Sequence, residues 1–116
     1  MERSMLQVFV KNSAQALEFY QKAFDAKILY SSPDSNGNLM HSELDVYGQI
    51  MAVSELADEA AVTGNTMMFC MHMGAGQETV VQKIYDVLKE DAKIVSPPAP
   101  CDYSPLEFVL TDKYGV

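Results

Sequence analysis

The chain has 116 residues, of which 48% are hydrophobic and 21% charged, so it can form a compact unit whose core needs no disulfide. A net charge of −8 disfavours nucleic acid and anionic membranes as partners, because both attract clustered lysine and arginine. No apolar run approaches the roughly 18 residues of a membrane helix, and the N-terminus does not resemble a secretory signal, so we expect a cytoplasmic protein.

Hydrophobic periodicity predicts the elements of the first half. Residues 5–11 are rich in β-branched and aromatic side chains, which indicates a strand. Apolar side chains then recur at helical spacing from Leu17 to Phe24, after Asn12 or Ser13, either of which can cap the first turn with its side chain. Further strands are expected at residues 27–31, 39–47 and 50–54, the last two as a hairpin.

The second half follows a similar plan. Residues 66–73 form an apolar run that predicts a strand, with Cys70 buried in it as an inert thiol. A helix with an apolar stripe is expected from residue 77. The next strand, at residues 93–96, is expected to end at Pro97-Pro98, and the last visible strand is at residues 106–110.

The tetrapeptide Asp-Ala-Lys-Ile stands at the same helix-to-strand junction in both halves, at residues 25–28 and 91–94. A duplicated unit explains this best. The chain then has an α+β fold, β-α-β-β-β followed by β-α-β-β, and the last strand of the second half is missing. We expect one module at about residues 1–56, a linker at about 57–65 and a second module at about 66–116. Either the sequence is cut short or another chain completes the sheet.

Four stretches carry a family signature. Residues 12–26 read N-x-x-x-A-x-x-F-Y-x-x-x-F-x-A, and LMHSEL, IMAVSE and YSPLEFVLTDKYGV follow at residues 39–44, 50–55 and 103–116. They resemble the first helix, the M-H-A-E-L strand, the return strand and the closing D-x-F-G turn of the vicinal-oxygen-chelate (glyoxalase, bleomycin-resistance and dioxygenase) superfamily. The PhnB-like group, also labelled 3-demethylubiquinone-9 3-methyltransferase, is the most similar. The resemblance implies two βαβββ modules that form a cup, usually within a homodimer.

Metal-dependent members of that superfamily take four ligands from the first and last strands of the two modules. The resemblance puts the fourth ligand position after residue 116. Divalent ions prefer histidine, carboxylate or carbonyl ligands, which methionine and valine do not supply. We therefore expect no metal quartet and no cofactor, with a divalent ion elsewhere as the open alternative. The other three positions hold Met5 or Gln7, Val53 or Glu55, and Met68 or Cys70.

His41, Glu43 and Asp45 alternate along a predicted strand and so share one face. His41 and Glu43 are the candidate catalytic residues, because a carboxylate can orient an imidazole for acid–base work. The plainer interpretation is a solvated strand face. If both modules face one cup, His41 and His72 could meet there. The candidate ligand-pocket residues are Gln7, Met68, Cys70, His72 and Tyr103.

The predicted function is that of a PhnB-like protein that binds a small organic molecule in the cup. Two alternatives stay open. One is an enzyme of the superfamily, either a metal-dependent lyase or dioxygenase or a metal-free acid–base enzyme that uses His41 and Glu43. The other is a dimerising module without catalytic activity. The cup is expected to be rich in methionine, supplied by Met40, Met51, Met67, Met68, Met71 and Met73.

Overall fold

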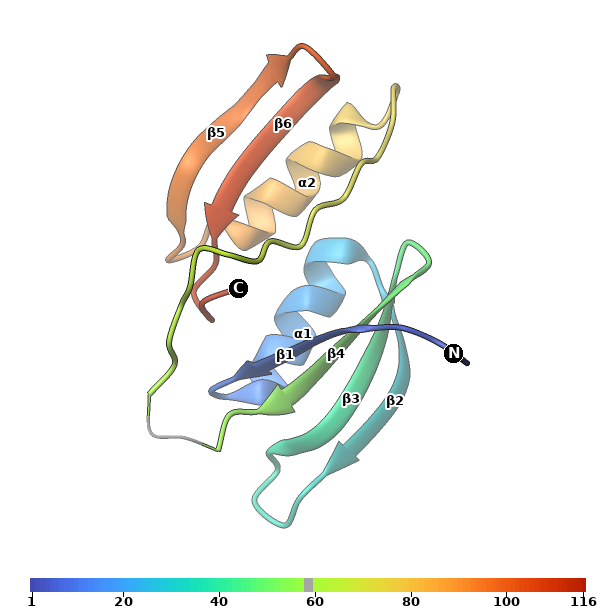
Figure 1. The fold of residues 1–116 in the computed structure, drawn as a ribbon, viewed down its shortest axis with the longest axis vertical. Helices are drawn as coiled ribbons and strands as arrows, with labels where there is room; N and C mark the ends of the chain where they lie inside the picture. The colour runs from blue at the N-terminus through green and yellow to red at the C-terminus, as the bar shows by residue number, and fades with distance from the viewer. Residues whose placement is uncertain (58–59) are drawn as a thin grey trace. The chain divides into compact units, whose positions relative to one another are not determined.

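The structure, a computed structural model, describes residues 1–57 and 60–116. The chain divides into two compact units, which we call unit 1 (Met1–Thr63) and unit 2 (Gly64–Val116). Neither of the described helices is long and apolar enough to cross a membrane. The predicted α+β class is confirmed. The elements, labelled in Figure 1, are β1 (Leu6–Val10), α1 (Ser13–Phe24), β2 (Lys27–Pro33), β3 (Leu39–Val46), β4 (Gln49–Glu55), α2 (Glu78–Leu88), β5 (Lys93–Cys101) and β6 (Ser104–Thr111).

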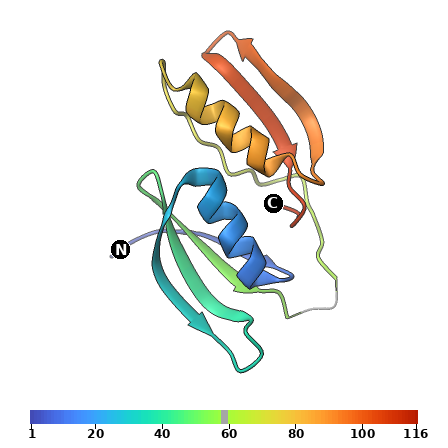
Figure 2. The same cartoon turned by 180° about the vertical axis from the view of Figure 1, so that it is seen from behind.

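Unit 1 is a four-stranded sheet covered on one face by α1. The strand order is β1-β4-β3-β2, with β1 parallel to β4 and the other pairs antiparallel. Figure 2 shows α1 lying across the sheet. Leu44 of β3 and Met51 and Val53 of β4 are buried in this core. The stacked rings of Tyr20 and Phe24, with centroids 6.2 Å apart, complete this core.

The start of α1 is fixed from outside the helix. The expectation that Asn12 or Ser13 caps the first turn with its own side chain is wrong, since Asn12 makes no such hydrogen bond. The Glu55 carboxylate, at the end of β4, instead accepts hydrogen bonds from the backbone N–H and the hydroxyl of Ser13, at 2.9 and 2.8 Å. The backbone N–H of Leu39 donates to the same hydroxyl at 2.8 Å. Ser13 therefore ties α1 to β3 and β4.

Unit 2 consists of α2 and the antiparallel pair β5–β6, preceded by an irregular segment. α2 lies across one face of the pair (Figure 2), where the rings of Tyr85 and Phe108 meet edge to face with centroids 5.1 Å apart. Ile84 and Leu88 are the buried apolar side chains of α2. Most of the remaining apolar surface in this unit is only partly covered.

The sequence repeat is also a structural repeat. Asp25 and Asp91 both take the left-handed conformation, with φ of 50° and 54°. The strand after each begins with the same register and the same bulge, at positions 66 residues apart. β5 and β6 thus correspond to β2 and β3. The matching pairs before the bulge are Lys27–Asp45 and Ile28–Leu44 in unit 1, and Lys93–Thr111 and Ile94–Leu110 in unit 2.

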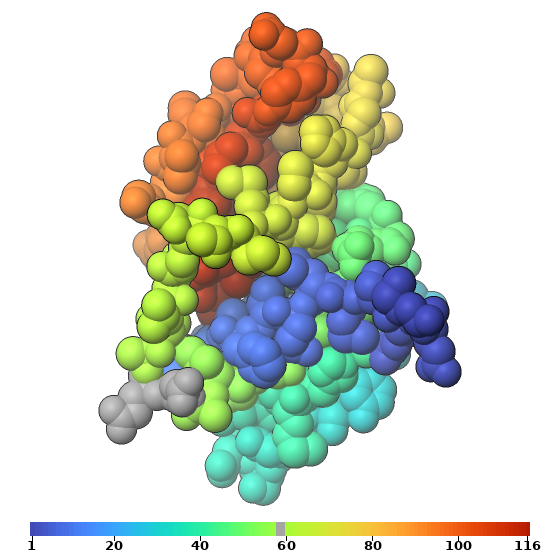
Figure 3. All heavy atoms as spheres, in the orientation of Figure 1, coloured from blue at the N-terminus to red at the C-terminus, as the bar shows by residue number. Residues whose placement is uncertain are grey.

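The strand predicted at residues 66–73 is wrong, because the structure assigns no strand to that segment. In unit 1, β1 is a strand because it pairs with β4, which also pairs with β3. The described part of unit 2 has no strand in the corresponding place beside β6. An apolar sequence favours a strand, but only pairing makes one. Figure 3 shows the segment, in yellow-green, at the surface over the red residues of β6, and Cys70, predicted to be buried, is exposed.

Two other expectations are wrong. Prolines do not end the strand after α2, which runs through Pro97 and Pro98 to Cys101. β5 is an edge strand, so on the side that faces away from β6 its backbone has no neighbouring strand to donate a hydrogen bond to, and proline can stand there.

The methionines do not form a common interior, because most of them fall on unpaired or outward-facing positions. Met51 is buried, Met71 and Met73 are half-buried, and Met40, Met67 and Met68 are 63%, 86% and 68% exposed.

Candidate functional site

The sheet of unit 1 carries polar side chains on the face away from α1. We call it the open face because Phe9 and Tyr30 are exposed on it, whereas Glu43, Ala52 and Ser54 at its centre are at most 5% exposed. Gln7, Ala52 and Glu43 are direct neighbours across β1, β4 and β3, so their side chains point to the same side. Met51 and Leu44, next to them in sequence, point into the core under α1. The alternation predicted for residues 39–47 therefore puts Glu43 on the open face.

Glu43 holds two partners although little of its side chain, 6%, is exposed. Its Oε2 accepts a hydrogen bond from the Arg3 guanidinium at 2.7 Å, and its Oε1 lies 2.9 Å from His41 Nε2. The bonds from Arg3 and then His41 lower the pKa of the Glu43 carboxyl, against the opposing effect of burial. Glu43 is therefore a carboxylate at neutral pH and acts only as an acceptor.

The ionised state of Glu43 determines how His41 can act. Because the carboxylate only accepts, the 2.9 Å contact requires the proton of the neutral imidazole to lie on Nε2. His41 Nδ1 then presents a lone pair, and 34% of the side chain is exposed. A nitrogen of this kind can accept a hydrogen bond from a ligand or take its proton.

Aromatic and amide groups surround this pair on the open face. The Tyr30 ring lies 6.0 Å from the His41 ring, measured between centroids. Tyr30 and Phe9 are 53% and 59% exposed, which leaves two aromatic surfaces for contact. Gln7 donates from Nε2 to Ser54 Oγ at 3.1 Å. The open face thus combines a directed acceptor with apolar surface.

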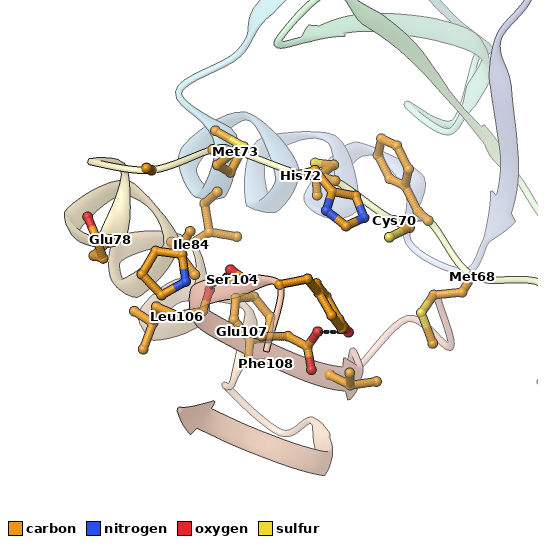
Figure 4. A pocket seen from close by; sticks show the side chains of 18 residues that line it. Met68, Cys70, His72, Met73, Glu78, Ile84, Ser104, Leu106, Glu107 and Phe108 are labelled. Atoms are coloured by element: carbon orange, nitrogen blue, oxygen red, sulfur yellow. Dashed lines mark hydrogen bonds between the residues drawn. The ribbon is translucent and has the colours of Figure 1, made fainter. Parts of the chain in front are cut away.

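Unit 2 contains a separate concave region of about 520 Å³, which we call the unit 2 groove. Figure 4 shows the segment that carries Cys70, His72 and Met73 along one side and β6 along the other. Four predicted pocket residues, Met68, Cys70, His72 and Tyr103, line this groove. The full lining is residues 68–75, residues 103–109, and Glu78, Val81 and Ile84 of α2.

A tyrosine–carboxylate pair lies in the unit 2 groove. The hydroxyl of Tyr103 donates to the Glu107 carboxylate (dashed line in Figure 4). This hydrogen bond, helped by the negative charge of Glu107, raises the pKa of Tyr103 to about 12. Cys101 Sγ lies 3.7 Å from Glu107, and the His72 ring lies 6.1 Å from that of Tyr103. The phenol is thus held protonated as a donor.

The sequence matches a single family over almost its whole length. The family model described as the Glyoxalase/Bleomycin resistance protein/Dioxygenase superfamily covers residues 4–116. The chain belongs to this superfamily. The family resemblance predicted from the sequence is thereby confirmed, and no curated protein matches significantly.

Solved structures with the superfamily fold are similar to this chain over almost its whole length. The PhnB protein from Bacillus cereus, assigned provisionally as a 3-demethylubiquinone-9 3-methyltransferase, gives a TM-score of 0.76 at 20% identity, over 99% of this chain and 95% of its own. Protein PA1353 from Pseudomonas aeruginosa gives 0.76 at 14% identity, over 100% and 93%. A variant of the fosfomycin resistance protein FosX from Listeria monocytogenes, in complex with Mn(II) and 1S,2S-dihydroxypropylphosphonic acid, gives 0.61 at 19% identity, over 97% and 85%. At these identities the likeness shows the fold alone.

The metal-ligand positions that the superfamily resemblance marks in this chain do not fit a divalent ion. Gln7 and Glu55 are hydrogen-bonded to Ser54 and Ser13. Val53 is buried in the core and has no donor atom. The described residues also contain no group of three histidine, cysteine or acidic side chains that could hold an ion. The remaining positions hold the thioethers of Met5 and Met68 and the exposed thiol of Cys70.

The structure brings some predicted site residues together and assigns others to different units. His41, Glu43 and Gln7 lie on the open face of unit 1, whereas His72 belongs to unit 2. The meeting of His41 and His72 in one cup stays a prediction.

Three residues of these sites, Arg3, Tyr30 and Glu107, were not predicted from the sequence. Arg3 and Tyr30 carry no local signal, because their roles depend on pairing across the sheet. Glu107 could have been found from the repeat, since it stands 66 residues after His41.

Proposed function

We propose that the protein binds a small organic molecule on the open face of unit 1, without a metal ion. The observation that carries the proposal is the buried Glu43 carboxylate, held between Arg3 and His41, which leaves His41 Nδ1 as an acceptor. The ligand class is a molecule with a hydroxyl or another hydrogen-bond donor and an apolar or aromatic body. The donor meets His41, and the body packs against Tyr30 and Phe9.

A fragment screen, by thermal shift and then protein-observed NMR in the presence of EDTA, tests this proposal. We expect hits to perturb the resonances of residues 41–43 and to lose about tenfold or more in affinity in His41→Ala, because a hydrogen bond to the imidazole is removed. Asp45→Asn is the matched control, since Asp45 is an exposed carboxylate of the same strand. Binding that requires a divalent ion, or that His41→Ala leaves unchanged, would refute the proposal.

The pKa of Glu43 gives a second test. Since folding lowers this pKa, the stabilising bonds to Arg3 and His41 are present above the unfolded-state pKa, near the ordinary 4.5, and are lost as the pH falls through the folded-state value. Wild type should therefore lose both stability and ligand affinity on acidification. In Glu43→Gln both should be lower at pH 7 and should change less with acid. Parallel acid profiles for the two proteins would contradict the assigned role.

The same geometry favours a second candidate function, metal-free proton transfer. His41 Nδ1 can take a proton from a bound weak acid while Glu43 stabilises the imidazolium that forms. Ligands from the screen, incubated with the protein in D₂O, would then exchange a C–H proton faster than in buffer. Glu43→Gln should slow this exchange by about 10²-fold.

We extend the proposal to a homodimer, as the superfamily resemblance implies, and to a cytoplasmic location, as expected from the sequence. Analytical ultracentrifugation of the purified chain checks the oligomeric state. A single species of monomer mass at all concentrations would remove the homodimer from the proposal.

A further inference from the structure

Arg3 is held over the open face of unit 1 by its side chain, because it precedes the first strand. β1 begins at Leu6, and residues 1–5 belong to no helix or strand. Figure 1 shows these residues, in dark blue, passing in front of the sheet, and Figure 2 shows them behind it, on the side away from α1. The ion pair with Glu43 ties Arg3 to this face.

The ion pair between Arg3 and Glu43 leaves much of the guanidinium available. Within the described part of the chain, Arg3 makes this contact through Nη1 alone, to Glu43 Oε2 at 2.7 Å. Arginine carries its N–H donors in a planar fork, and 55% of the Arg3 side chain is exposed. The edge formed by Nε and Nη2 can therefore donate to a second acceptor.

The charges on the open face are matched locally, although the net charge of the chain is −8. Glu43 is paired with Arg3, and Asp45, on the same side of β3, stands directly opposite Lys27 of β2. The Glu55 carboxylate, at the end of β4, is bound at the start of α1, on the other face of the sheet. An anion that approaches Arg3 thus meets matched charges on the described strands of this face.

A carboxylate is the anion that the remaining edge of Arg3 fits best. Its two oxygens match two parallel N–H donors, and such charge-assisted pairs are roughly twice as strong as neutral hydrogen bonds. A lysine ammonium has no planar fork and acts as a point charge. With a carboxylate bound, Arg3 bridges Glu43 and the ligand.

Arg3 and His41 are close enough to contact one small molecule. Both bind the same carboxylate, Arg3 at Oε2 of Glu43 and His41 at Oε1, at 2.7 and 2.9 Å. The Tyr30 ring lies 6.0 Å from the His41 ring, measured between centroids. Neighbouring side chains thus offer partners for a carboxylate, a hydroxyl and an aromatic ring.

We propose that Arg3 determines the specificity of the open face: the ligands are aromatic carboxylates, and Arg3 binds the carboxylate. The inference rests on the proposed function, because it concerns the same site and keeps the hydrogen bond to His41. It adds the charge of the ligand and the residue that recognises it. Glu43 positions both Arg3 and His41 in this arrangement.

The ortho, meta and para isomers of hydroxyphenylacetate, each with its amide, are the probes. The isomers vary the distance between hydroxyl and carboxylate, and each amide keeps the shape of its acid without the charge. Protein-observed NMR titrations at neutral pH give the ratio of the affinity of an acid to that of its amide. We expect a ratio of about ten or more for at least one isomer, because a charge-assisted pair replaces a neutral one.

Two variants of Arg3 test the source of this preference. Arg3→Gln should reduce the ratio to about one, because glutamine carries no charge, and Arg3→Lys should keep part of it. If Arg3 only supported the fold, Arg3→Gln would weaken the acid and its amide alike. Lys22→Gln is the matched control, since it removes the same charge from α1, on the other face of the sheet, and should leave the ratio unchanged.

Three outcomes would overturn the assignment of Arg3: no binding by any probe, a ratio near one for all three isomers, or a ratio that survives in Arg3→Gln. Neutral fragments that bind through His41 would still leave the proposed function standing. Conversely, an acid preference that requires Arg3 and is unchanged in His41→Ala would support the carboxylate site and refute the role given to His41.

Discussion

The two units share one repeat but differ in how completely they are packed. Of the sixteen buried apolar side chains among the described residues, fourteen lie in unit 1 and two, Ile84 and Leu88, in unit 2. In the part of the chain that the structure describes, unit 1 has four strands under its helix and unit 2 has two. A two-stranded sheet with one helix is close to the smallest assembly that is stable in water.

The comparison of the two units shows which features the helix-to-strand junction sets and which features require a complete sheet. Both junctions place an aspartate in the left-handed conformation and start the next strand in the same register. In unit 1, β4 then joins β1 to β3, and the helix closes over a continuous core. In unit 2 the apolar segment before α2 remains partly exposed. The junction therefore sets the conformation of its aspartate and the register of the next strand, whereas the burial of apolar side chains depends on the fourth strand.

Truncations in the two cores test this comparison with the largest expected effect. Leu44→Ala should lower the free energy of unfolding by about 2–5 kcal/mol, because Leu44 is fully buried. Ile84→Ala should cost about 2 kcal/mol, at the low end of the same range, since fewer packed side chains surround it. Urea denaturation measures both. Equal losses would mean that the two cores are equally packed.

Ser13→Ala should have the next largest effect. The substitution removes the hydroxyl that donates to Glu55 and leaves the buried N–H of Leu39 without its acceptor. This should lower the free energy of unfolding by about 1–3 kcal/mol. Thr79→Ala, 66 residues later at the start of α2, is the matched control. Thr79 is exposed, so its removal should change stability by less than about 0.5 kcal/mol. A large loss in Thr79→Ala would show that α2 is anchored as α1 is.

The repeated junction offers a smaller and symmetric effect. Asp25→Ala and Asp91→Ala should each cost about 1 kcal/mol, because alanine is disfavoured at positive φ. Replacing either aspartate by glycine should restore most of this loss. Thermal unfolding followed by circular dichroism measures the four variants. If alanine is costly at only one position, the two junctions are not equivalent in solution.

Breaking the Tyr103–Glu107 hydrogen bond in unit 2 should change the pKa of Tyr103 and leave the free energy of unfolding nearly unchanged. The difference in ultraviolet absorbance between wild type and Tyr103→Phe, measured at increasing alkaline pH, should give a pKa of about 12 for Tyr103. In Glu107→Gln the phenol should ionise nearer its ordinary 10.0, because a neutral amide no longer disfavours the phenolate. A titration unchanged in Glu107→Gln would show that the hydrogen bond is absent in solution.

Much of the fold could be predicted from local patterns. Periodicity located both helices and the six observed strands, and the Asp-Ala-Lys-Ile repeat revealed the duplication. The alternation around Glu43 placed it on one face with His41. Residues 66–73 and β5 show where local reasoning fails. An apolar run is not a strand without a partner, and prolines do not end a strand at a sheet edge.

The α+β class, the repeat, the superfamily and the choice of His41 and Glu43 could all be inferred from the sequence, because they follow from patterns within short stretches. The three-dimensional structure was needed to find that Arg3 holds Glu43, that Glu55 anchors Ser13, and that Cys70 is exposed. Each of these depends on a residue about 40 positions away, or on a strand at one edge of a sheet. Such pairings are set by the packing of the whole unit, and periodicity along the chain does not encode them.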